Sequence, residues 1–491
     1  MIDGAKIDEY LREVIAKGDK GSNLLAGICG PTLRNHRYVQ VVREGMNGIA
    51  VLAGLPKDYR VVVHSAGGDP QISNPEIYAK SLVHNLVRGA EEIGAMPIAF
   101  TNVIDAGKID LGEIETIGKA LAESANRHNL AIMNGELAGL GDRVTGYANV
   151  SGTMVSLVHC NRGVPNEAYG VRYATFNHEG RLVFMNSDGV GTKIEITAER
   201  GGKPGLSLSD SIAMKVDDAI KWGAEVKVVS DVVETRGVGS GMIKELDGIA
   251  SVLGDSLGFE YILQQERVGT RIRGYKEGIP TLNISGTAVS LIDEKTLKDL
   301  PKPSAGEFLV AIRGKPNPRS NGITDKRRIM VELFGPNWHE TSEGKVFMRF
   351  LGEPSTIFYG LFSQLRQSGL ATSFYHMSGG AFDGKLARPL AKDDLFVRVA
   401  NLFPADWRES TIVGARCTPA EVAYAKWPMG NEGFVTTNRP NDTMEVIASR
   451  KYGLEARIVG RIETAIDGRT GVELAEVNAS NGKPVYFSGK K

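Results

Sequence analysis

Apolar and polar residues follow strand and helix periods in one connected series between residues 60 and 160. Short apolar runs alternate with longer segments of helical period, which indicates strands and helices in alternation. The predicted elements are a strand (60–64), a glycine turn (66–69), a helix (75–94), a strand (96–103), a helix (111–129), a strand (130–133) and a closing strand pair. This order predicts an α/β unit.

The same series returns between residues 181 and 292. Its predicted elements are a strand (181–185), a turn at 188–189, a helix (208–223), a strand (226–233), a helix (241–257), a strand (261–263) and a closing strand pair. Three short matches keep their order in both series: 94–95 with 223–224, 134–136 with 264–266, and SGTMVSL (151–157) with SGTAVSL (285–291). We interpret residues 1–160 and 165–300 as two copies of one α/β unit.

From residue 301 the pattern changes. Lys302-Pro303-Ser304 is typical of a linker. The elements predicted after it are a strand (307–312), helices (325–333, 356–367 and 444–452), a strand that runs into His376, and a last strand (456–462). Residues 301–491 therefore form a third, carboxy-terminal α/β domain in this interpretation.

The composition is that of an ordinary globular protein. It has 42% hydrophobic and 24% charged residues among 491, and 58 basic residues balance 58 acidic ones, so no global field favours nucleic acid or an anionic membrane. No apolar run approaches the ~20 residues of a membrane helix, and the amino terminus begins an amphipathic helix rather than a signal peptide. Cys29, Cys160 and Cys417 are too scattered for a disulfide framework or a zinc site, and we expect a cytoplasmic protein.

One polar run directly follows the first strand of the second unit. It reads Asn186-Ser187-Asp188-Gly189-Val190-Gly191-Thr192-Lys193. A carboxylate at a strand end can hold Mg²⁺, glycines let backbone N–H groups approach a phosphate, and a lysine adds positive charge. The spacing is not that of a Walker-type loop. The alternative is a structural glycine turn in which Lys193 is only solvated.

The two units differ at this position. The first has Ala66-Gly67-Gly68-Asp69 where the second has its acid, glycines and lysine, and it has His84-Asn85-Leu86-Val87-Arg88 where the second has Lys215-Val216-Asp217-Asp218. A basic residue there would repel a metal–nucleotide complex. The first unit keeps the tidier Asn134-Gly135-Glu136 loop. We therefore predict that the second unit binds nucleotide and that the first is a degenerate partner that lends one loop.

The third domain offers two polar turns. Ser320-Asn321-Gly322 opens a helix, where N–H groups and a hydroxyl can bind an anion. A strand leads into His376-Met377-Ser378-Gly379-Gly380, a composition suited to a phosphate or a ribose. A plain capped helix and a structural histidine are the alternatives.

Together these motifs resemble the aminoimidazole ribonucleotide (AIR) synthetases, also called phosphoribosylformylglycinamidine cyclo-ligases, of the PurM-like superfamily. The resemblance covers about residues 165–465, and its segments are 188–193, 214–218, 223–225, 230–231, 319–322, 352–358, 376–388, 404–407 and 431–434. This sequence differs from the family pattern at Arg319, where the family has histidine, at Ala381, where it has glycine, and in its extra first unit.

The resemblance implies an α+β, PurM-like fold. Two amino-terminal units would pair their sheets as a pseudo-dimeric β-barrel, with a carboxy-terminal α/β domain beside them. A tether of about twenty residues between the units favours pairing within one chain, and both a monomer and a homodimer remain open. The implied activity is ATP-dependent cyclisation of formylglycinamidine ribonucleotide to aminoimidazole ribonucleotide. In this reaction the amide oxygen of the formyl group is phosphorylated, and a nitrogen of the same substrate then attacks the carbon that bears this oxygen.

The resemblance also implies roles for individual residues. Catalytic roles fall on Asp188, Lys193 and His376. The implied Mg²⁺ ligands are Asp188, Asp218 and Asp231. The implied ATP contacts are Gly189, Gly191, Thr192, Lys193 and, from the first unit, Glu136. The implied ribonucleotide contacts are Ser320, Asn321, Gly322, Ser378, Gly379 and Gly380.

Two other classes of protein stay open. One is a different ATP-dependent phosphoryl-transfer enzyme of the superfamily, such as a selenophosphate synthetase or a small-molecule kinase. Cys29 suggests the former, but its setting lacks the expected neighbouring lysine. The other is a non-catalytic nucleotide-binding scaffold, against which the intact 188–193 run argues, because a scaffold needs neither the acid nor the lysine.

Overall fold

The computed structural model describes residues 4–34, 36–43, 49–199, 203–236, 240–267, 281–465 and 467–489. The chain divides into two compact units: Arg12–Lys298, called here the repeat domain, and Asp299–Lys491 with Met1–Leu11, called the carboxy-terminal domain. This division falls beside the predicted boundary at residue 300. Both predicted amino-terminal domains, 1–160 and 165–300, lie almost wholly within the repeat domain.

The repeat domain contains two six-stranded sheets. The first has the order β10 (Ala174–Phe176), β3 (Tyr59–Gly67), β7 (Asn149–His159), β4 (Met96–Ala106) and β5 (Ala131–Ile132), with β6 (Glu136–Gly139) also paired to β4. The second has the order β1 (Val39–Arg43), β2 (Ile49–Leu52), β11 (Leu182–Gly189), β14 (Thr281–Ile292), β12 (Glu225–Arg236) and β13 (Glu260–Arg267). A separate hairpin joins β8 (Glu167–Ala168) to β9 (Val171–Arg172).

The two sheets repeat one topology. In each, two antiparallel pairings are followed by a parallel one, along β3-β7-β4-β5 and along β11-β14-β12-β13. The strands that precede each series are exchanged: β2 pairs with β11, and β10 pairs with β3. The predicted series of elements is therefore observed twice, with its leading strands swapped between the sheets. Of the closing strand pair predicted for the second series, only β14 lies within the described residues.

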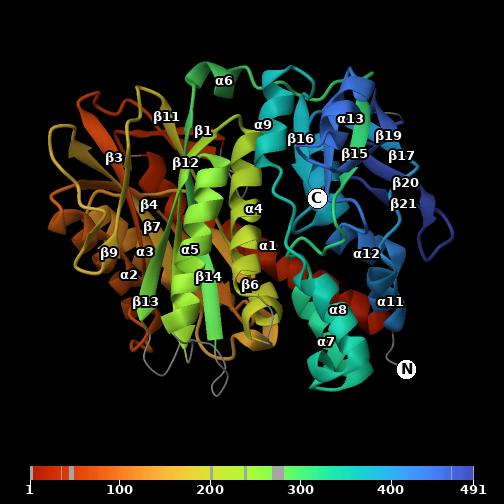
Figure 1. Ribbon diagram of the computed structural model, residues 1–491, viewed down its shortest axis with the longest axis horizontal. Coiled ribbons are helices and arrows are strands. Elements are labelled where there is room, and N and C mark those ends of the chain that lie inside the picture. The colour runs from red at the N-terminus through yellow and green to blue at the C-terminus, as the bar shows by residue number, and fades with distance from the viewer. Residues whose placement is uncertain are drawn as a thin grey trace. The chain divides into compact units, whose positions relative to one another are not determined.

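Helices cover the outer faces of both sheets (Figure 1). They are α2 (Pro75–Glu92) and α3 (Leu111–Arg127) on the first sheet, and α4 (Gly205–Lys221) and α5 (Ser240–Leu257) on the second. The domain also contains most of α1 (Gly4–Arg34), a π-helical turn (Glu195–Glu199) and α6 (Glu294–Lys298). Asn74 and Asp110 cap α2 and α3 by accepting hydrogen bonds from their first-turn N–H groups, which fixes where these helices begin.

The sheets face each other across a core that contains one layer of apolar side chains and another of serine and threonine hydroxyls. Val61, Val155, Val183 and Val289 are among the fully buried apolar residues of that core. Three hydroxyl pairs also join the sheets: Ser65–Ser230 at 2.7 Å, Ser151–Ser285 at 2.7 Å and Thr101–Thr287 at 2.6 Å between the oxygens. Pairing offsets the cost of burying these groups. Within the described residues no strand ladder joins the two sheets, so their closure into a barrel stays a prediction.

The carboxy-terminal domain is built on one seven-stranded sheet. Its order is β16 (Ser373–His376), β18 (Gly433–Thr437), β15 (Phe308–Arg313), β19 (Glu455–Thr464), β17 (Leu395–Val399), β20 (Gly471–Asn478) and β21 (Pro484–Phe487). Its helices are α7 (Ile323–Phe334), α8 (Ser342–Gly352), α9 (Tyr359–Gln367), α10 (Arg388–Lys392), α11 (Trp407–Ala415), α12 (Ala420–Lys426) and α13 (Pro440–Ala448), with a 3-10 turn (Trp338–Glu340) and a π-helical turn (Phe382–Ala387).

The prediction that the strand at 456–462 is the last one is wrong. It corresponds to β19, after which β20 and β21 extend the sheet. Only the first four residues of β20 are buried, and Glu473 and Glu476 interrupt its apolar residues, so its apolar run is too short to stand out. The helix predicted at 444–452 starts and ends four residues earlier, because Pro440 takes the first turn.

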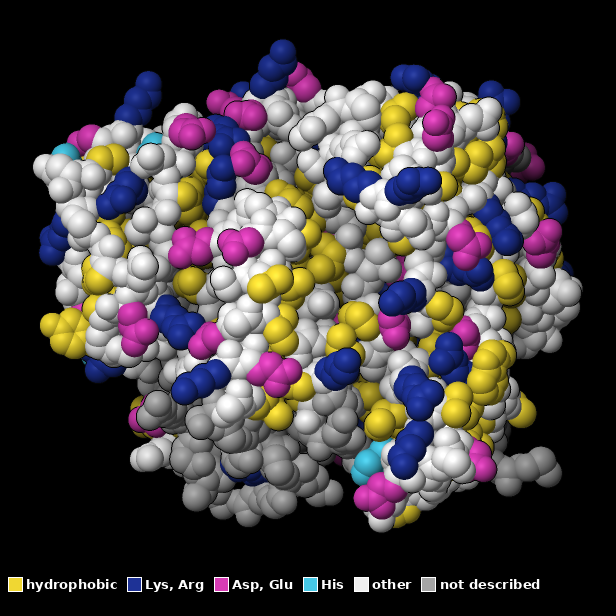
Figure 2. Space-filling view, in the orientation of Figure 1, with side chains coloured by type: hydrophobic (Ala, Val, Ile, Leu, Met, Phe, Trp, Pro, Cys, Tyr) yellow, Lys and Arg dark blue, Asp and Glu magenta, His cyan; other side chains and the backbone are white. Residues whose placement is uncertain are grey.

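No described helix is both long and apolar enough to cross a membrane. On the face shown in Figure 2, lysine and arginine side chains are interspersed with aspartate and glutamate, in keeping with the balanced composition.

Candidate functional site

The polar run at 186–193 lies at the end of β11. Asp188 and Gly189 still pair with Gly286 and Ser285 of β14. The Asp188 carboxylate is partly buried, and its Oδ1 accepts a hydrogen bond from Gly189 N at 2.7 Å. Gly191 has φ of +66°, a conformation that favours glycine. The predicted strand followed by a glycine turn is thus observed.

Lys193 does not lie on an open loop, contrary to what the sequence suggested. It begins a helical turn, its side chain is 0% exposed, and its Nζ lies 2.9 Å from Oδ1 of Asp210, which is equally buried on α4. A buried ammonium requires such a partner, because desolvation of an unpaired charge is very costly. The amine is committed to Asp210, so its predicted contact with a phosphate has no support from this geometry.

Asp231 lies inside the domain, on β12. Its Oδ2 accepts hydrogen bonds from Ser211 Oγ and from Tyr261 Oη, both at 2.7 Å, and its Oδ1 accepts one from Lys215 Nζ. Burial, followed by the negative charge of Asp231, raises the pKa of Tyr261 well above its ordinary value. Three donors occupy this carboxylate, which leaves its predicted role as a metal ligand without structural support.

The other two predicted metal ligands are more accessible. Asp218 is part-buried on α4 and pairs with Lys221 one turn further along the helix. Asp188 is part-buried at the end of β11. In the described part of the chain no group of three or more acid, histidine or cysteine side chains is arranged to hold a metal ion.

The first repeat reaches the end of β11. Asn134 Nδ2 donates to Met185 O at 3.0 Å, and Ser187 Oγ donates to Asn134 O at 3.4 Å. A Cβ atom added to Gly191 would meet Leu140 Cδ2 at 3.5 Å. Glu136 follows Asn134 by two residues and is partly buried on β6. The loop of the first repeat therefore lies where the sequence places it, while the role of Glu136 itself stays a prediction.

One pair of equivalent side chains shows how the repeats correspond. His64 Nε2 lies 2.9 Å from Leu86 O in the first repeat, and Asn186 Nδ2 lies 3.2 Å from Lys215 O in the second. Burial lowers the pKa of His64 to about 4. By this correspondence Leu86 is the equivalent of Lys215. Through the equivalent strands β4 and β12, Asn102 is the equivalent of Asp231. The buried lysine–aspartate pair thus belongs to the second repeat alone.

In the carboxy-terminal domain, four polar segments meet around Glu432. This residue is 2% exposed. Its Oε1 accepts a hydrogen bond from Gly314 N at 2.7 Å, and its Oε2 accepts from Asn317 Nδ2 at 2.8 Å and from Thr356 Oγ1 at 2.6 Å. Its backbone oxygen accepts from Met377 N at 2.9 Å. Glu432 therefore ties the end of β15, the following turn, the segment before α9 and the end of β16 together.

Arg319 lies beside this carboxylate and is 0% exposed. Its Nη1 is 3.8 Å from Glu432 Oε2 and donates to Thr356 O at 2.7 Å. Its Nη2 is 3.5 Å from His376 Nδ1, and its guanidinium stacks over Phe358 with Cζ 4.8 Å from the ring centre. The buried charge of Arg319 is thus paired, and it links the first polar turn to the second.

The two predicted turns of this domain come together. Asn321 Nδ2 donates to Ser378 O at 3.0 Å. Ser320 has φ of +52° and Gly322 has φ of +62°; for a non-glycine residue this left-handed conformation costs about 1–2 kcal/mol. The Ser320 Oγ is buried with no hydrogen-bond partner among the described residues. Strain and an unsatisfied hydroxyl in one turn are typical of a binding site.

The second turn is equally tight. Gly380 has φ of +86°, and Ala381 has φ of +35° and N–H donating to Ser378 O at 2.9 Å. Gly379 and Gly380 are exposed, whereas Ser378 is 6% exposed. The exposed glycines leave their backbone accessible beside the Ser320 turn.

Comparison with known proteins gives one family match and several relatives of known name. The family profile "AIR synthase related protein, N-terminal domain" matches residues 48–158, which is the first repeat. A phosphoribosylformylglycinamidine cyclo-ligase of Synechococcus sp. (strain RCC307) is 30% identical over 249 residues, which are 48% of this chain and 66% of that protein. The enzyme of the same name from Thermoplasma volcanium is 24% identical over 313 residues, 60% of this chain and 83% of that protein. The family match at residues 48–158 and these two relatives support a PurM-like AIR synthetase family for this chain.

The similar solved structures are more distant in sequence. HypE of E. coli, a hydrogenase maturation protein, has 13% identity and a TM-score of 0.42, covering 62% of this chain and 84% of that one. Thiamine monophosphate kinase of Aquifex aeolicus has 13% identity and a TM-score of 0.39, covering 60% and 90%.

Two features of this AIR synthetase-like chain were not assigned to the site by sequence reasoning. Glu432 stands in one of the segments that carry the family resemblance, and Arg319 stands where the family has histidine, yet neither received a role. A buried charge pair joins residues more than a hundred positions apart and leaves no periodic pattern. Only the departure at Arg319 gave a usable signal.

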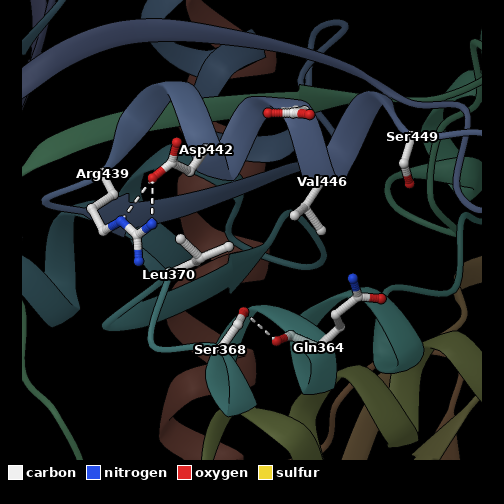
Figure 3. Close-up of a pocket in the computed structure, with 8 residues that line it drawn as sticks. Gln364, Ser368, Leu370, Arg439, Asp442, Val446 and Ser449 are labelled. Carbon is white, nitrogen blue, oxygen red and sulfur yellow. Dashed lines mark hydrogen bonds and ion pairs between the residues drawn. The ribbon is translucent and has the colours of Figure 1, made fainter.

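A groove of about 440 Å³ lies elsewhere in the carboxy-terminal domain, along α9 and α13 (Figure 3). Its lining residues are Gln364, Ser368, Leu370, Arg439, Asp442, Glu445, Val446 and Ser449. Arg439 is paired there with Asp442, whose Oδ2 lies 2.6 Å from Nη2. None of the residues predicted from the sequence lines this groove.

Proposed function

We propose that the chain catalyses the ATP-dependent closure of formylglycinamidine ribonucleotide to aminoimidazole ribonucleotide. One observation carries the proposal: the segments around Ser320, His376 and Glu432, which resemble those of the cyclo-ligases, meet in one cluster of strained turns. The cyclo-ligase names of the relatives support the same chemistry. Because the chain spans 66% of the Synechococcus relative, the activity of the whole protein is part of the proposal.

In this proposal the ribonucleotide binds at the paired turns. The Ser320 and Ser378 hydroxyls and the exposed backbone at Gly379 and Gly380 hold its oxygens. Asn321 fixes the distance between the turns through its bond to Ser378 O. Holding the formyl-derived amide in one orientation lowers the entropy cost of ring closure, in which the nitrogen attacks a carbon of the same molecule.

ATP binds, in this proposal, at the end of β11 in the repeat domain. Gly191 gives a turn that a phosphate can approach, and the Asn134–Glu136 loop of the first repeat borders it. ATP supplies the phosphoryl group that converts the amide oxygen into a leaving group. Of the predicted metal ligands, Asp188 fits a Mg²⁺ ion that arrives with the nucleotide, because such an ion needs only one or two protein carboxylates. Asp231 does not fit, since its oxygens are occupied.

We further propose that the two repeats arose by duplication and that they act as a pseudo-dimer within one chain. Identical strand order, exchanged leading strands and equivalent side-chain contacts support this.

The test is ADP release by the full chain with a panel of substrates. Formylglycinamidine ribonucleotide should stimulate ADP formation and yield the imidazole product, while thiamine monophosphate and selenide should not. Turnover of another panel member in its place would reassign the chain within the superfamily. Nucleotide binding without turnover of any substrate would favour the scaffold alternative.

A further inference from the structure

We propose that Arg319, held by Glu432, is a positioning residue that fixes His376 in the tautomer with its proton on Nε2, so that the hydrogen of the Ser378 hydroxyl is left for the ligand. The inference rests on the proposed function only for the identity of that ligand, an oxygen acceptor of a ribonucleotide. The tautomer itself follows from the contacts of the carboxy-terminal domain.

The guanidinium of Arg319 is fixed on three sides. Glu432 Oε2 is 3.8 Å from Nη1, Thr356 O accepts from the same nitrogen at 2.7 Å, and the Phe358 ring lies under Cζ at 4.8 Å. Glu432 itself accepts hydrogen bonds from three neutral donors, which fix the position of its carboxylate beside Arg319. A guanidinium keeps its proton and its planar set of donors under all ordinary conditions. Arg319 therefore presents a constant, fixed N–H donor to whatever faces Nη2.

The group that faces Nη2 is the His376 ring. Its Nδ1 lies 3.5 Å from Nη2, and the whole side chain is 0% exposed. Because a guanidinium has no acceptor, a proton on Nδ1 would set two donors against each other, whereas a lone pair on Nδ1 accepts the Arg319 hydrogen. The ring proton must then be on Nε2. This nitrogen lies 3.2 Å from Ser378 Oγ and donates to it.

The consequence appears at Ser378. Its Oγ accepts from His376 Nε2, so its own hydrogen is available for another acceptor. The Ser378 backbone is held by Asn321, and the residues that follow, Gly379 and Gly380, are exposed. The hydroxyl is therefore oriented as a donor at the edge of the exposed turn, which suits a phosphate or ribose oxygen of the ligand. In the opposite tautomer the Ser378 hydroxyl would have to donate its hydrogen to Nε2, and it could not donate the same hydrogen to the ligand.

The first test reads the tautomer directly. In the full chain labelled with ¹⁵N at its histidine rings, the signals of His376 are assigned by their loss in the His376→Gln variant. We expect the long-range ¹H–¹⁵N pattern of the Nε2–H tautomer at pH 7. The Arg319→Met variant, which removes the donor, should lose that single pattern. Arg366→Lys is the matched control, because Arg366 also stacks on a phenylalanine, with Cζ 4.9 Å from the Phe374 ring centre; it should keep the pattern. A protonated Nδ1 in the unmodified chain overturns the inference.

The second test measures how much the Ser378 hydroxyl contributes to ribonucleotide binding. Ser378→Ala and Arg319→Lys should each raise KM for the ribonucleotide about 10- to 100-fold, the scale of a lost hydrogen bond to a charged group, with a much smaller change in KM for ATP. Glu432→Gln, which keeps the shape of the side chain, replaces Arg319→Lys if that variant fails to fold. Equal increases in both KM values overturn the positioning role. If the unmodified chain does not turn over this ribonucleotide, the proposed function fails, while the tautomer pattern still decides the inference.

Discussion

Lys193 and Lys215 are completely buried in the second repeat, and each is paired with an aspartate there. Such pairs are poor sources of stability, because desolvation of both charges offsets their attraction. The equivalent of Lys215 and Asp231 in the first repeat is a leucine and an asparagine, which pack without that cost. The second repeat therefore keeps buried charge that folding does not require, around the helix that borders the end of β11.

Replacing Lys193 distinguishes a structural from a catalytic lysine. In Lys193→Met, the buried carboxylate of Asp210 would lose its 2.9 Å contact with the ammonium, so we expect a loss of about 3–5 kcal/mol in the free energy of unfolding by urea. The double variant Lys193→Met/Asp210→Leu should recover most of that loss. If the single variant keeps its stability but loses ATP turnover, the amine acts on the nucleotide as the sequence suggested.

His64 gives the repeat domain a pH dependence with a definite sign. Burial lowers its pKa in the folded chain to about 4, below the ordinary 6.5. Between these values the unfolded chain binds a proton that the folded chain does not, so this contribution is complete above pH 6.5 and is lost as the pH falls towards 4, by roughly 3 kcal/mol in all. Urea unfolding at a series of pH values measures it.

The matched variant for this prediction is His64→Asn, because Asn186 makes the equivalent contact in the second repeat. It should flatten the dependence between pH 4 and 6.5 while the domain stays folded. His84→Asn, which changes an exposed histidine on α2, should keep the dependence of the unmodified chain. An unchanged slope in His64→Asn would mean that another group is responsible.

At the scale of elements, local pattern was enough for most helices and central strands. The run before Asp188 and the segment before His376 are strands as predicted, since each has a dense apolar run beside a glycine turn. The pattern did not reveal β2 or β10, each of which pairs with a strand more than a hundred residues away, β11 for β2 and β3 for β10. It also placed Lys193 on a loop, because sequence shows a charge but not the Asp210 that allows its burial. What was missed depends on contacts between distant segments.

The Asn134–Glu136 loop links several elements, and α1 supports it from behind. A Cβ atom added to Gly21 of α1 would meet Leu137 Cδ2 at 2.7 Å, so the helix passes directly against β6. Asn134 in turn bonds to Met185 of β11. The loop is thus clamped between a helix and the strand whose end is proposed to bind ATP.

Asn134→Ala should therefore weaken nucleotide binding more than ribonucleotide binding. We expect KM for ATP to rise about 3- to 10-fold, the scale of one lost hydrogen bond that orients a loop, with KM for the ribonucleotide nearly unchanged. Gln264→Ala is the control: Gln264 lies on β13 of the second repeat, where its amide contacts Gly170 and Arg172. If both variants change KM for ATP equally, the loop of the first repeat has no special role.

For the whole molecule, the exchanged strands decide how the repeats associate. β2 completes the sheet of the second repeat and β10 that of the first, so neither sheet is complete without the other. The linker between the repeats is short enough that the effective concentration of one repeat around the other is on the order of millimolar. In the predicted barrel, pairing within the chain removes the exposed sheet edges that a single repeat would have, and no second chain is needed for it.

The pairing is symmetric in topology, but the two turns differ in the side chain that lies beside them. In the first repeat, a Cβ atom on Gly68 would lie 2.4 Å from the ring of Tyr78, which is fully buried and donates to Asn149 Oδ1 at 2.7 Å. The equivalent position on α4 is Ser207, a much smaller side chain. An aromatic ring thus fills the turn of the first repeat, and Ala66 takes the position of Asp188 there.

We therefore predict that calorimetry finds about one ATP per chain, bound at the turn of the second repeat. Asp188→Asn should abolish or strongly weaken this binding, whereas Asp69→Asn, which changes the acid in the turn of the first repeat, should leave it intact. Two ATP per chain, or binding lost in Asp69→Asn, would mean that the first repeat is a nucleotide site in its own right.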